Sequence, residues 1–290
     1  MKFISYSING DHSFGVVDGD GIIDLGSRVS KRGGDGLLEV MRDMRLEEMK
    51  DLAAGLTADV DLADIQYERP VSYPDKIACI GVNYANRNEE YKDGSEPPKY
   101  PSLFMRTADS FTGHMQPMLR PPESDQLDYE GEIVVVIGKE GRRIKQEDAF
   151  DHIAGLTIMN EGSIRDWLRH AKFNVTQGKN FVHSGSIGPW MVSADEFSPE
   201  FLQDMWVRTW VNDEERQADT TASMMFPIAY QISYLSTFFN FKPGDMIATG
   251  TPNGAGARFD PPKWLVPGDT CRIAVDGVGE LVNPIEDEQV

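Results

Sequence analysis

The sequence predicts an α+β protein, mostly β, with a small N-terminal β-rich domain and a larger C-terminal domain. Apolar and polar residues alternate over 2–23, and a dense run of β-branched residues fills 133–137. Near the C-terminus, two strand-like segments meet at Asp276 and Gly277. These three observations indicate that strands, not helices, build most of the core.

Charge and length limit the function. The chain has 290 residues and a formal net charge of -19, from 28 Lys and Arg against 47 Asp and Glu. No basic run is present, so a nucleic-acid partner is not expected. An acidic protein also repels anionic substrates, so an anion-binding site here needs local cations.

Cysteine use and hydropathy favour a cytoplasmic protein. Cys79 and Cys271 both lie in apolar, strand-like segments, typical of buried thiols in a reducing compartment. The first ten residues, MKFISYSING, show no signal-peptide pattern. The most hydrophobic stretch, 224–241, is interrupted by proline, glutamine and serine, which indicates a buried helix and not a membrane span. No membrane partner is therefore expected.

The N-terminal domain is predicted over residues 1–72. A hairpin turn, DGDG, occupies 18–21, and an amphipathic helical pattern covers 36–56. Prolines between 67 and 74 mark a boundary, which leaves residues 73–290 for the second domain.

The second domain opens with a buried strand at 76–82, followed by a long polar segment over 83–101. A loop of this length is typical of a lid or binding element. Arg87 and Glu90 within it are three residues apart and can pair on a helical turn, or can be solvated surface residues.

The segment 127–138, LDYEGEIVVVIG, is the densest predicted core strand. Glu130 and Glu132 stand at its start, and the two-residue period of a strand places both carboxylates on one face. A hard divalent cation such as Mg²⁺ or Mn²⁺ would offset their repulsion. The alternative is an exposed strand end with two solvated glutamates.

Three further polar residues follow predicted strands or lie in glycine-rich loops. Glu161 follows a strand at 155–159 and could complete the acidic pair, or could be a first-turn glutamate favoured by a helix dipole. Lys179 lies in a loop that lacks the P-loop glycine spacing. Thr251 lies in a glycine-rich loop whose amides suit a carboxylate, or in an ordinary turn cluster.

Several ordered motifs together resemble the fumarylacetoacetate hydrolase family, over roughly residues 75–290. The motifs that carry the resemblance are GVNYANRNEEY (81–91), LDYEGEIVVVIG (127–138), IAGLTIMNEGSIRDW (153–167), GKNF with SIGPW (178–190), NDEERQ (212–217) and PGDMIATGTPNGAG (243–256).

The resemblance implies a mixed β-roll catalytic domain, usually in a homodimer, that holds Mg²⁺ or Mn²⁺. The metal ligands it implies are Glu130, Glu132 and Glu161. The family more often has aspartate at the third position, and the longer glutamate can shift the cation or bind it through water.

The resemblance also implies roles around the metal. Lys179 matches the family lysine, which can neutralise a developing enolate oxygen, and Thr251 matches a carboxylate-binding threonine. Arg106 lies where a basic residue commonly binds the substrate carboxylate. Tyr84 and His114 complete the predicted substrate-binding residues.

One departure from the family concerns proton transfer. Similar hydrolases and decarboxylases use a lid histidine with a glutamate, and this chain has Arg87 at that histidine and retains Glu90. Arginine is a poor general base. Glu90 can activate water while Arg87 orients it, His114 or His170 can substitute, or the reaction needs no such base.

The resemblance therefore predicts a metal-dependent hydrolase that cleaves the C–C bond of a 2,4-dioxo, acylpyruvate-like acid to pyruvate and a carboxylic acid. Such substrates occur in aromatic or sugar-acid catabolism, as fumarylpyruvate, maleylpyruvate or 2,4-diketo-3-deoxyrhamnonate. The alternatives are a 2-oxo acid decarboxylase, an isomerase, a 2-oxo-4-enoate hydratase, and a catalytically silent binding protein.

Overall fold

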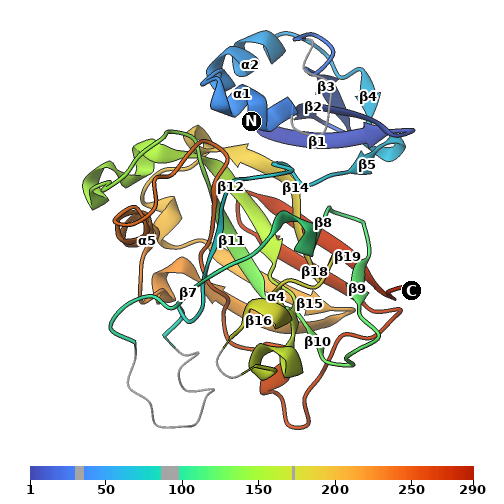
Figure 1. The fold of residues 1–290 in the computed structure, drawn as a ribbon. Coiled ribbons are helices and arrows are strands. Elements are labelled where there is room, and N and C mark those ends of the chain that lie inside the picture. Colours follow the sequence, from blue (N-terminus) through green and yellow to red (C-terminus); the bar gives the residue numbers. More distant parts are fainter. Residues whose placement is uncertain (30–35, 86–97, 172–173) are drawn as a thin grey trace.

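The structure is a computed structural model that describes residues 1–29, 36–85, 98–171 and 174–290. Arg87 and Glu90 lie outside the described residues. The fold is α+β and mostly β, as the sequence predicts. Figure 1 shows a large β-rich body with the N-terminal segment at one end.

The largest sheet runs through both parts of the chain. Its strands follow the spatial order β4-β3-β2-β1-β14-β12-β11-β17-β6-β7, with β5 beside β1 and β8 beside β14. Their bounds are β1 Lys2–Ile8, β2 Asp11–Asp18, β3 Gly21–Asp24, β4 Val60–Asp61, β5 Gln66–Tyr67, β6 Ile77–Ile80, β7 Leu103–Met105, β8 Phe111–Thr112, β11 Gly131–Ile137, β12 Ile153–Asn160, β14 Gly185–Ser193 and β17 Met246–Ala248.

A second sheet packs against the first, and two short strands form a separate pair. The second sheet has the order β16-β15-β18-β19-β9, and the pair is β10-β13. Their bounds are β9 Met118–Arg120, β10 Leu127–Asp128, β13 Ser163–Ile164, β15 Trp206–Val211, β16 Glu214–Thr220, β18 Thr270–Val275 and β19 Gly279–Asp287.

The helices are short. The α-helices are α1 Gly36–Arg42, α2 Leu46–Ala53, α4 Thr176–Lys179 and α5 Ile228–Leu235. The 3-10 helices are η1 Leu62–Asp64, η2 Ala108–Ser110, η3 Gln146–His152, η4 Arg165–Arg169, η5 Ala194–Glu196, η6 Phe201–Gln203, η7 Thr221–Ser223 and η8 Gly256–Arg258. Among the described residues, none of these helices is long and apolar enough to cross a membrane.

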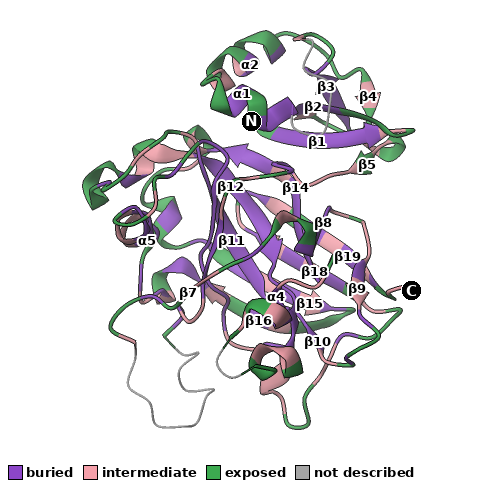
Figure 2. Cartoon of the chain, in the orientation of Figure 1, coloured by how far each residue is buried: buried purple, intermediate pink, exposed green. Residues whose placement is uncertain are grey.

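Strand β11 is the centre of the core. All of its residues are buried, and the strand lies among the buried strands in the middle of the molecule (Figure 2). Its β-branched side chains alternate between two sides, as strand geometry requires. Ile133, Val135 and Ile137 belong to the cluster shared with the second sheet, and Val134 and Val136 belong to the cluster shared with the N-terminal strands. The strand therefore has a core on each face, which explains its continuous apolar run.

The two predicted helices are shorter than their sequence patterns. The pattern over 36–56 forms α1 and α2 instead of one helix, because Met44 between them adopts a φ of 57°. The pattern over 224–241 narrows to α5, which begins after Pro227, and Phe241 forms a β-bridge with Gly141 beyond its end.

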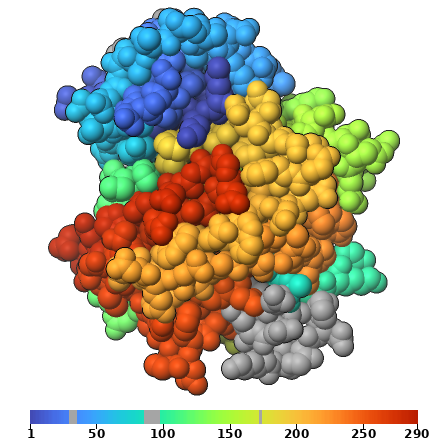
Figure 3. All heavy atoms as spheres, turned by 180° about the vertical axis from the view of Figure 1, so that it is seen from behind, coloured from blue at the N-terminus to red at the C-terminus, as the bar shows by residue number. Residues whose placement is uncertain are grey.

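The N-terminal strands extend the main sheet. Strand β1 pairs with β14 in antiparallel register, Lys2 opposite Val192 and Phe3 opposite Met191. Seen from the reverse side, the N-terminal residues cover one end of the molecule above the C-terminal strands (Figure 3). The predicted division after residue 72 thus separates two parts that share one sheet, and the boundary itself stays a prediction.

Candidate active site

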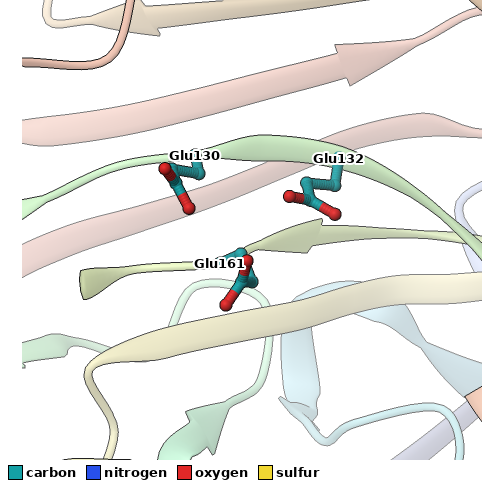
Figure 4. Close-up of side chains that lie close together, drawn as sticks. All are labelled: Glu130, Glu132 and Glu161. Carbon is teal, nitrogen blue, oxygen red and sulfur yellow. The ribbon is translucent and has the colours of Figure 1, made fainter. Parts of the chain in front are cut away.

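Three glutamates converge at one end of the main sheet. Glu130 and Glu132 come from the start of β11, and Glu161 follows β12, which pairs antiparallel with β11 so that Gly131 lies opposite Asn160. One carboxylate oxygen from each glutamate lies within 4.8 Å of the others (Figure 4). All three side chains are buried, so the exposed-strand-end interpretation is wrong.

The residue between the paired glutamates must be small. A Cβ atom at Gly131 would lie 2.2 Å from Thr209 Oγ1 on β15, so a larger residue would push the second sheet away. The Asn160 Oδ1 accepts a hydrogen bond from the Glu130 amide, and the Gln217 Oε1 accepts one from the Gly131 amide. The backbone that carries the two carboxylates is therefore fixed from both sides.

Cationic side chains bind two of the three carboxylates. Lys179 Nζ lies 2.6 Å from Glu130 Oε2 and 3.0 Å from Glu161 Oε1. Arg165 Nη2 lies 2.7 Å from the other oxygen of Glu130, and Arg106 Nη1 lies 3.4 Å from Glu161 Oε1. Such charge-assisted contacts stabilise the ionised carboxylates in a buried site.

The negative charge of Glu132 is balanced much less than the charges of Glu130 and Glu161. Its described hydrogen-bond donor is the Gly250 amide, at 2.9 Å from Oε2. Burial, followed by the charges of Glu161 and Glu130, raises the pKa of Glu132 well above its ordinary range. Burial is also the main cause that raises the pKa of Glu161. The ionised triad therefore calls for a further positive charge.

The site fits a divalent cation. Its donors are carboxylate oxygens, which hard cations such as Mg²⁺ and Mn²⁺ prefer. The hydroxyl of Tyr84 is buried and has no hydrogen-bond partner among the described residues. Burial and then the charge of Glu132 raise the pKa of Tyr84, so this hydroxyl stays protonated beside the triad.

Lys179 reaches the triad from the end of α4. A Cβ atom on the preceding Gly178 would lie 2.6 Å from the Ile164 carbonyl, so glycine is needed where α4 packs against β13. Lys179 Nζ also lies 5.1 Å from the centre of the Phe104 ring. The structure thus brings the predicted lysine to the predicted carboxylates.

Arg106 and Thr251 are both buried and already hydrogen-bonded. Besides its contact with Glu161, Arg106 donates to the Gly162 carbonyl at 2.9 Å and to Ser184 Oγ at 3.1 Å. Thr251 Oγ1 accepts a hydrogen bond from Gln217 Nε2 at 2.8 Å. The described contacts of Arg106 make it a partner of Glu161, and its predicted binding of a substrate carboxylate stays a prediction.

The histidines named as substitute bases have other partners. His114 Nδ1 accepts a hydrogen bond from the Val282 amide, and its ring packs edge-on against Tyr67. Burial lowers the pKa of His114 to about 4, so it is neutral at physiological pH. His170 stacks on Trp167 with 4.0 Å between ring centres. The described contacts do not bring either histidine to the triad.

Two residues that the sequence analysis did not assign to the site support it. Asp128 is fully buried and accepts hydrogen bonds from Arg165 Nε at 2.7 Å and from the amides of Gly256 and Ala257. Arg165 therefore joins Asp128 to Glu130. Strand β10 pairs with β13 and so places Asp128 beside Arg165, a long-range contact with no local sequence signal.

A cavity of about 1000 Å³ is lined by side chains that contact the triad or Lys179, and not by the three glutamates themselves. Arg165 and Arg106, which contact Glu130 and Glu161, both line it, as does Phe104, which faces Lys179. The volume suits a small organic molecule.

Comparison with known proteins decides the family. Residues 76–286 match the family described as "Fumarylacetoacetate (FAA) hydrolase C-terminal". The chain belongs to the fumarylacetoacetate hydrolase family. The resemblance drawn from the sequence motifs is thus confirmed, and the matched region contains every residue of the site.

Curated relatives in the fumarylacetoacetate hydrolase family carry out different reactions. The chain is 40% identical over 228 residues to oxaloacetate tautomerase YisK of Bacillus subtilis, a match that covers 77% of this chain and 74% of that protein. It is 37% identical over 251 residues to a 4-hydroxyphenylacetate degradation bifunctional isomerase/decarboxylase of Salmonella dublin. That match covers 84% of this chain but only 56% of the relative.

Solved structures of family members share the whole fold. The maleylpyruvate hydrolase of Sphingobium sp. SYK-6, in complex with manganese(II) and pyruvate, superposes with a TM-score of 0.83 at 26% identity over 100% of both chains. The family fold is thereby shown, and this neighbour binds manganese.

Proposed function

We propose that this family member is a divalent-metal-dependent enzyme that acts on 2-oxo acids through an enolate. The observation that carries the proposal is the buried triad of Glu130, Glu132 and Glu161 with Lys179 Nζ between two of its carboxylates. The manganese and pyruvate in the structural neighbour support it, as does the tautomerase activity named for a 40% identical relative.

In the proposed reaction, a bound cation would stabilise negative charge, and side chains of the protein would move the proton. A divalent cation held by the three glutamates supplies Lewis-acid stabilisation of negative charge on a 2-oxo acid. Lys179 holds a proton close to Glu130 and Glu161 and is the described group best placed to deliver it to an enolate carbon or oxygen. Arg165 and Asp128 keep Glu130 in place while that proton moves.

Proton transfer is the reaction that the described site supports best. Keto-enol tautomerisation or isomerisation moves a proton between C3 and another atom of the substrate and needs no activated water. The structure describes all five histidines, and His12, His114, His152, His170 and His183 have their described contacts with residues outside the triad. A reaction without an imidazole base therefore fits the site.

Hydrolysis of the C–C bond of a 2,4-dioxo acid is the second candidate. It is supported by the maleylpyruvate hydrolase that superposes over the whole chain. This reaction needs a base that activates water, and Glu90 is the residue that the sequence predicts for it.

The homodimer and the cytoplasmic location that the sequence analysis expects stay predictions.

One assay distinguishes these reactions. Metal-stripped protein is incubated with oxaloacetate, acetylpyruvate and an unsaturated 2-oxo diacid, with and without Mg²⁺ or Mn²⁺, while enol absorbance, pyruvate and CO₂ are followed. Metal-dependent loss of the enol without pyruvate or CO₂ supports the proposal. Pyruvate with an equal amount of carboxylic acid from acetylpyruvate would move the assignment to hydrolysis. No turnover of any of these acids by metal-loaded protein would contradict both.

A further inference from the structure

The motif NDEERQ, at 212–217, ends on a buried glutamine that links two sheets and a loop. Gln217 lies on β16, in the second sheet. Its Oε1 accepts a hydrogen bond from the Gly131 amide at 3.0 Å, and Gly131 belongs to β11 of the main sheet. Its Nε2 donates to Thr251 Oγ1 at 2.8 Å and to the Pro252 carbonyl at 2.9 Å. One carboxamide therefore joins the strand of Glu130 and Glu132 to the loop that follows β17.

Two backbone partners determine how this carboxamide is oriented. The Gly131 amide can only donate a hydrogen bond, so it must face Oε1 of Gln217. The Pro252 carbonyl can only accept one, so it must face Nε2. The two hydrogens of Nε2 therefore both point to the loop, one to the Pro252 carbonyl and one to Thr251 Oγ1.

The orientation of Gln217 sets the direction of the Thr251 hydroxyl. Because the hydroxyl oxygen accepts a hydrogen from Gln217, its own hydrogen must point to a different acceptor. Thr251 is buried, and none of the residues that the structure describes accepts this hydrogen. A buried hydroxyl that is already fixed as a donor suits an oxygen of a bound anion.

The loop that carries Thr251 is held between the triad and β16. On one side, the Gly250 amide donates to Glu132 Oε2 at 2.9 Å. On the other side, a Cβ atom at Gly254 would lie 1.8 Å from the Arg216 carbonyl, so the loop backbone packs directly against β16. Thr251 lies along the chain between these two contacts, which fix its position before any ligand binds.

We propose that Gln217 is a positioning residue of the 2-oxo acid site. Its carboxamide fixes the Thr251 hydroxyl as a donor to an oxygen of the bound acid, and it ties this donor to the strand that carries Glu130 and Glu132. Gln217 acts through Thr251 and not by contact with the substrate. The inference rests on the proposed function, because the acid must bind at the triad to meet this hydroxyl.

Gln217→Glu reverses the hydroxyl with almost no change of shape. A carboxyl group still accepts the hydrogen bond from the Gly131 amide, but on the loop side it has one hydrogen when protonated and none when ionised. The Pro252 carbonyl cannot donate, so it takes the hydrogen if there is one. In either protonation state, the Thr251 hydroxyl turns to donate to Glu at position 217 and is lost to the ligand.

Binding of pyruvate, a small 2-oxo acid, measures this change without turnover. In calorimetric titration of the Mn²⁺-loaded protein, Gln217→Glu should weaken pyruvate binding by about tenfold, the scale of one hydrogen bond to a charged group. The affinity for Mn²⁺, titrated separately, should not fall, because the contact with the Gly131 amide is kept. The matched control is Gln203→Glu, the same change at an exposed glutamine, which should alter neither affinity.

A double-mutant cycle separates the hydroxyl from the added carboxyl group. Thr251→Val should weaken pyruvate binding by about tenfold, and Gln217→Glu should cause little further loss in that background. Thr251→Ser keeps a hydroxyl, so it should keep the wild-type affinity and the sensitivity to Gln217→Glu.

A neutral variant of equal length provides a second test, which also serves if Gln217→Glu does not fold. Gln217→Met cannot accept or donate these hydrogen bonds, so the Thr251 hydroxyl is free to rotate but can still donate to the ligand. Gln217→Met should therefore weaken pyruvate binding less than Gln217→Glu does, and its effect should also vanish in the Thr251→Val background. A purely structural role predicts the opposite order, because Gln217→Met removes all three hydrogen bonds.

The outcomes separate the inference from the proposed function. If Gln217→Glu keeps the wild-type pyruvate affinity, or either change at 217 weakens binding equally with and without the Thr251 hydroxyl, the positioning role is wrong and the 2-oxo acid site stands. If Gln217→Met weakens binding more than Gln217→Glu does, Gln217 is only structural and the inference is wrong. If the Mn²⁺-loaded wild type does not bind pyruvate, both the inference and the proposed function fail.

Discussion

One end of the central strands holds a single buried carboxylate and the other end holds a buried carboxylate cluster, and only the cluster lacks balancing charge. At one end, Asp245 precedes β17 and its carbonyl accepts a hydrogen bond from the Ile137 amide at the end of β11. At the other end, Gly250 follows β17 and donates to Glu132 at the start of β11. The same short strand, β17, therefore links Asp245 to the cluster.

The Asp245 end is balanced. The carboxylate accepts hydrogen bonds from Lys76 Nζ at 2.8 Å and from the amides of Lys76 and Lys242. One negative charge thus meets one cation and two backbone donors, which is how buried ion pairs are satisfied in stable cores.

The triad end is not balanced. Among the described residues, four carboxylates meet three cationic side chains there; the carboxylates are Asp128, Glu130, Glu132 and Glu161, and the cations are Arg106, Arg165 and Lys179. The comparison shows that burial of a carboxylate does not mark a site by itself. The unmatched negative charge, concentrated at Glu132, distinguishes a cation-binding site from a structural ion pair.

The largest expected effect is the loss of turnover when a glutamate of the triad is changed. Glu132→Gln removes a proposed metal ligand and should lower metal-dependent turnover by about a hundredfold or more, the scale for losing a main electrostatic stabiliser. The metal-free variant should be at least as stable as the wild type, because a neutral amide replaces a buried carboxyl whose ionised form is poorly compensated. Turnover and urea unfolding measure the two effects.

The matched control for this variant is Glu147→Gln, a change at an exposed glutamate near Lys145. It should leave turnover unchanged. Full activity in Glu132→Gln would show that the triad does not serve the reaction.

The next largest effect is on stability at the balanced end. Asp245→Asn leaves Lys76 without its charged partner and should lower the free energy of unfolding by about 2 kcal/mol. This loss is smaller than the usual loss for a fully buried ion pair, because the Lys76 side chain is 20% exposed. Metal binding should persist. Asp75→Asn, at an exposed neighbour, should change stability by about 0.5 kcal/mol or less. Equal effects of the two changes would contradict the difference in burial.

A smaller effect is expected from the residue that joins Asp128 to Glu130. Arg165→Gln frees one oxygen of Glu130 and should weaken Mn²⁺ affinity by about tenfold, typical of outer partners of metal ligands. Calorimetric Mn²⁺ titration measures this change. Arg208→Gln, at an arginine near Asp276 in the second sheet, is the control. An unchanged affinity in Arg165→Gln would show that Glu130 is held without it.

The smallest expected effect is a pH dependence of the free energy of unfolding of the metal-free protein. Burial raises the pKa of Glu132 and of Glu161 above the ordinary value of 4.5. The folded state therefore binds more protons than the unfolded state between the ordinary and the raised pKa, and the free energy of unfolding falls as pH rises through that interval. Urea unfolding in chelator across pH 4.5 to 8 measures the slope, and Glu132→Gln should reduce it. A slope that the variant leaves unchanged would contradict this assignment.

The sequence predicted the parts of this structure that depend on local pattern. The strand at β11 and the shared face of Glu130 and Glu132 follow from residue periodicity alone. The family motifs then selected Glu161 and Lys179, and the structure brings both to the pair.

Other features depend on contacts that no local pattern encodes. The role of Arg165 arises from the pairing of β10 with β13, and the link from Gln217 to Gly131 and Thr251 joins three separate segments. The break at Met44 was missed because the apolar period of the helical pattern continues across it. Long-range pairing and single backbone conformations are the information that periodicity lacks.

Direct detection of the cation is the clearest test of the central claim. Metal-stripped wild-type protein, Glu132→Gln and Asp245→Asn are titrated with Mn²⁺ while free Mn²⁺ is followed by electron paramagnetic resonance. We predict one bound Mn²⁺ per chain in the wild type and in Asp245→Asn, with the site lost in Glu132→Gln. Equal binding by Glu132→Gln and the wild type, or no binding by any of the three proteins, would show that the unmatched charge at the triad is not a metal site.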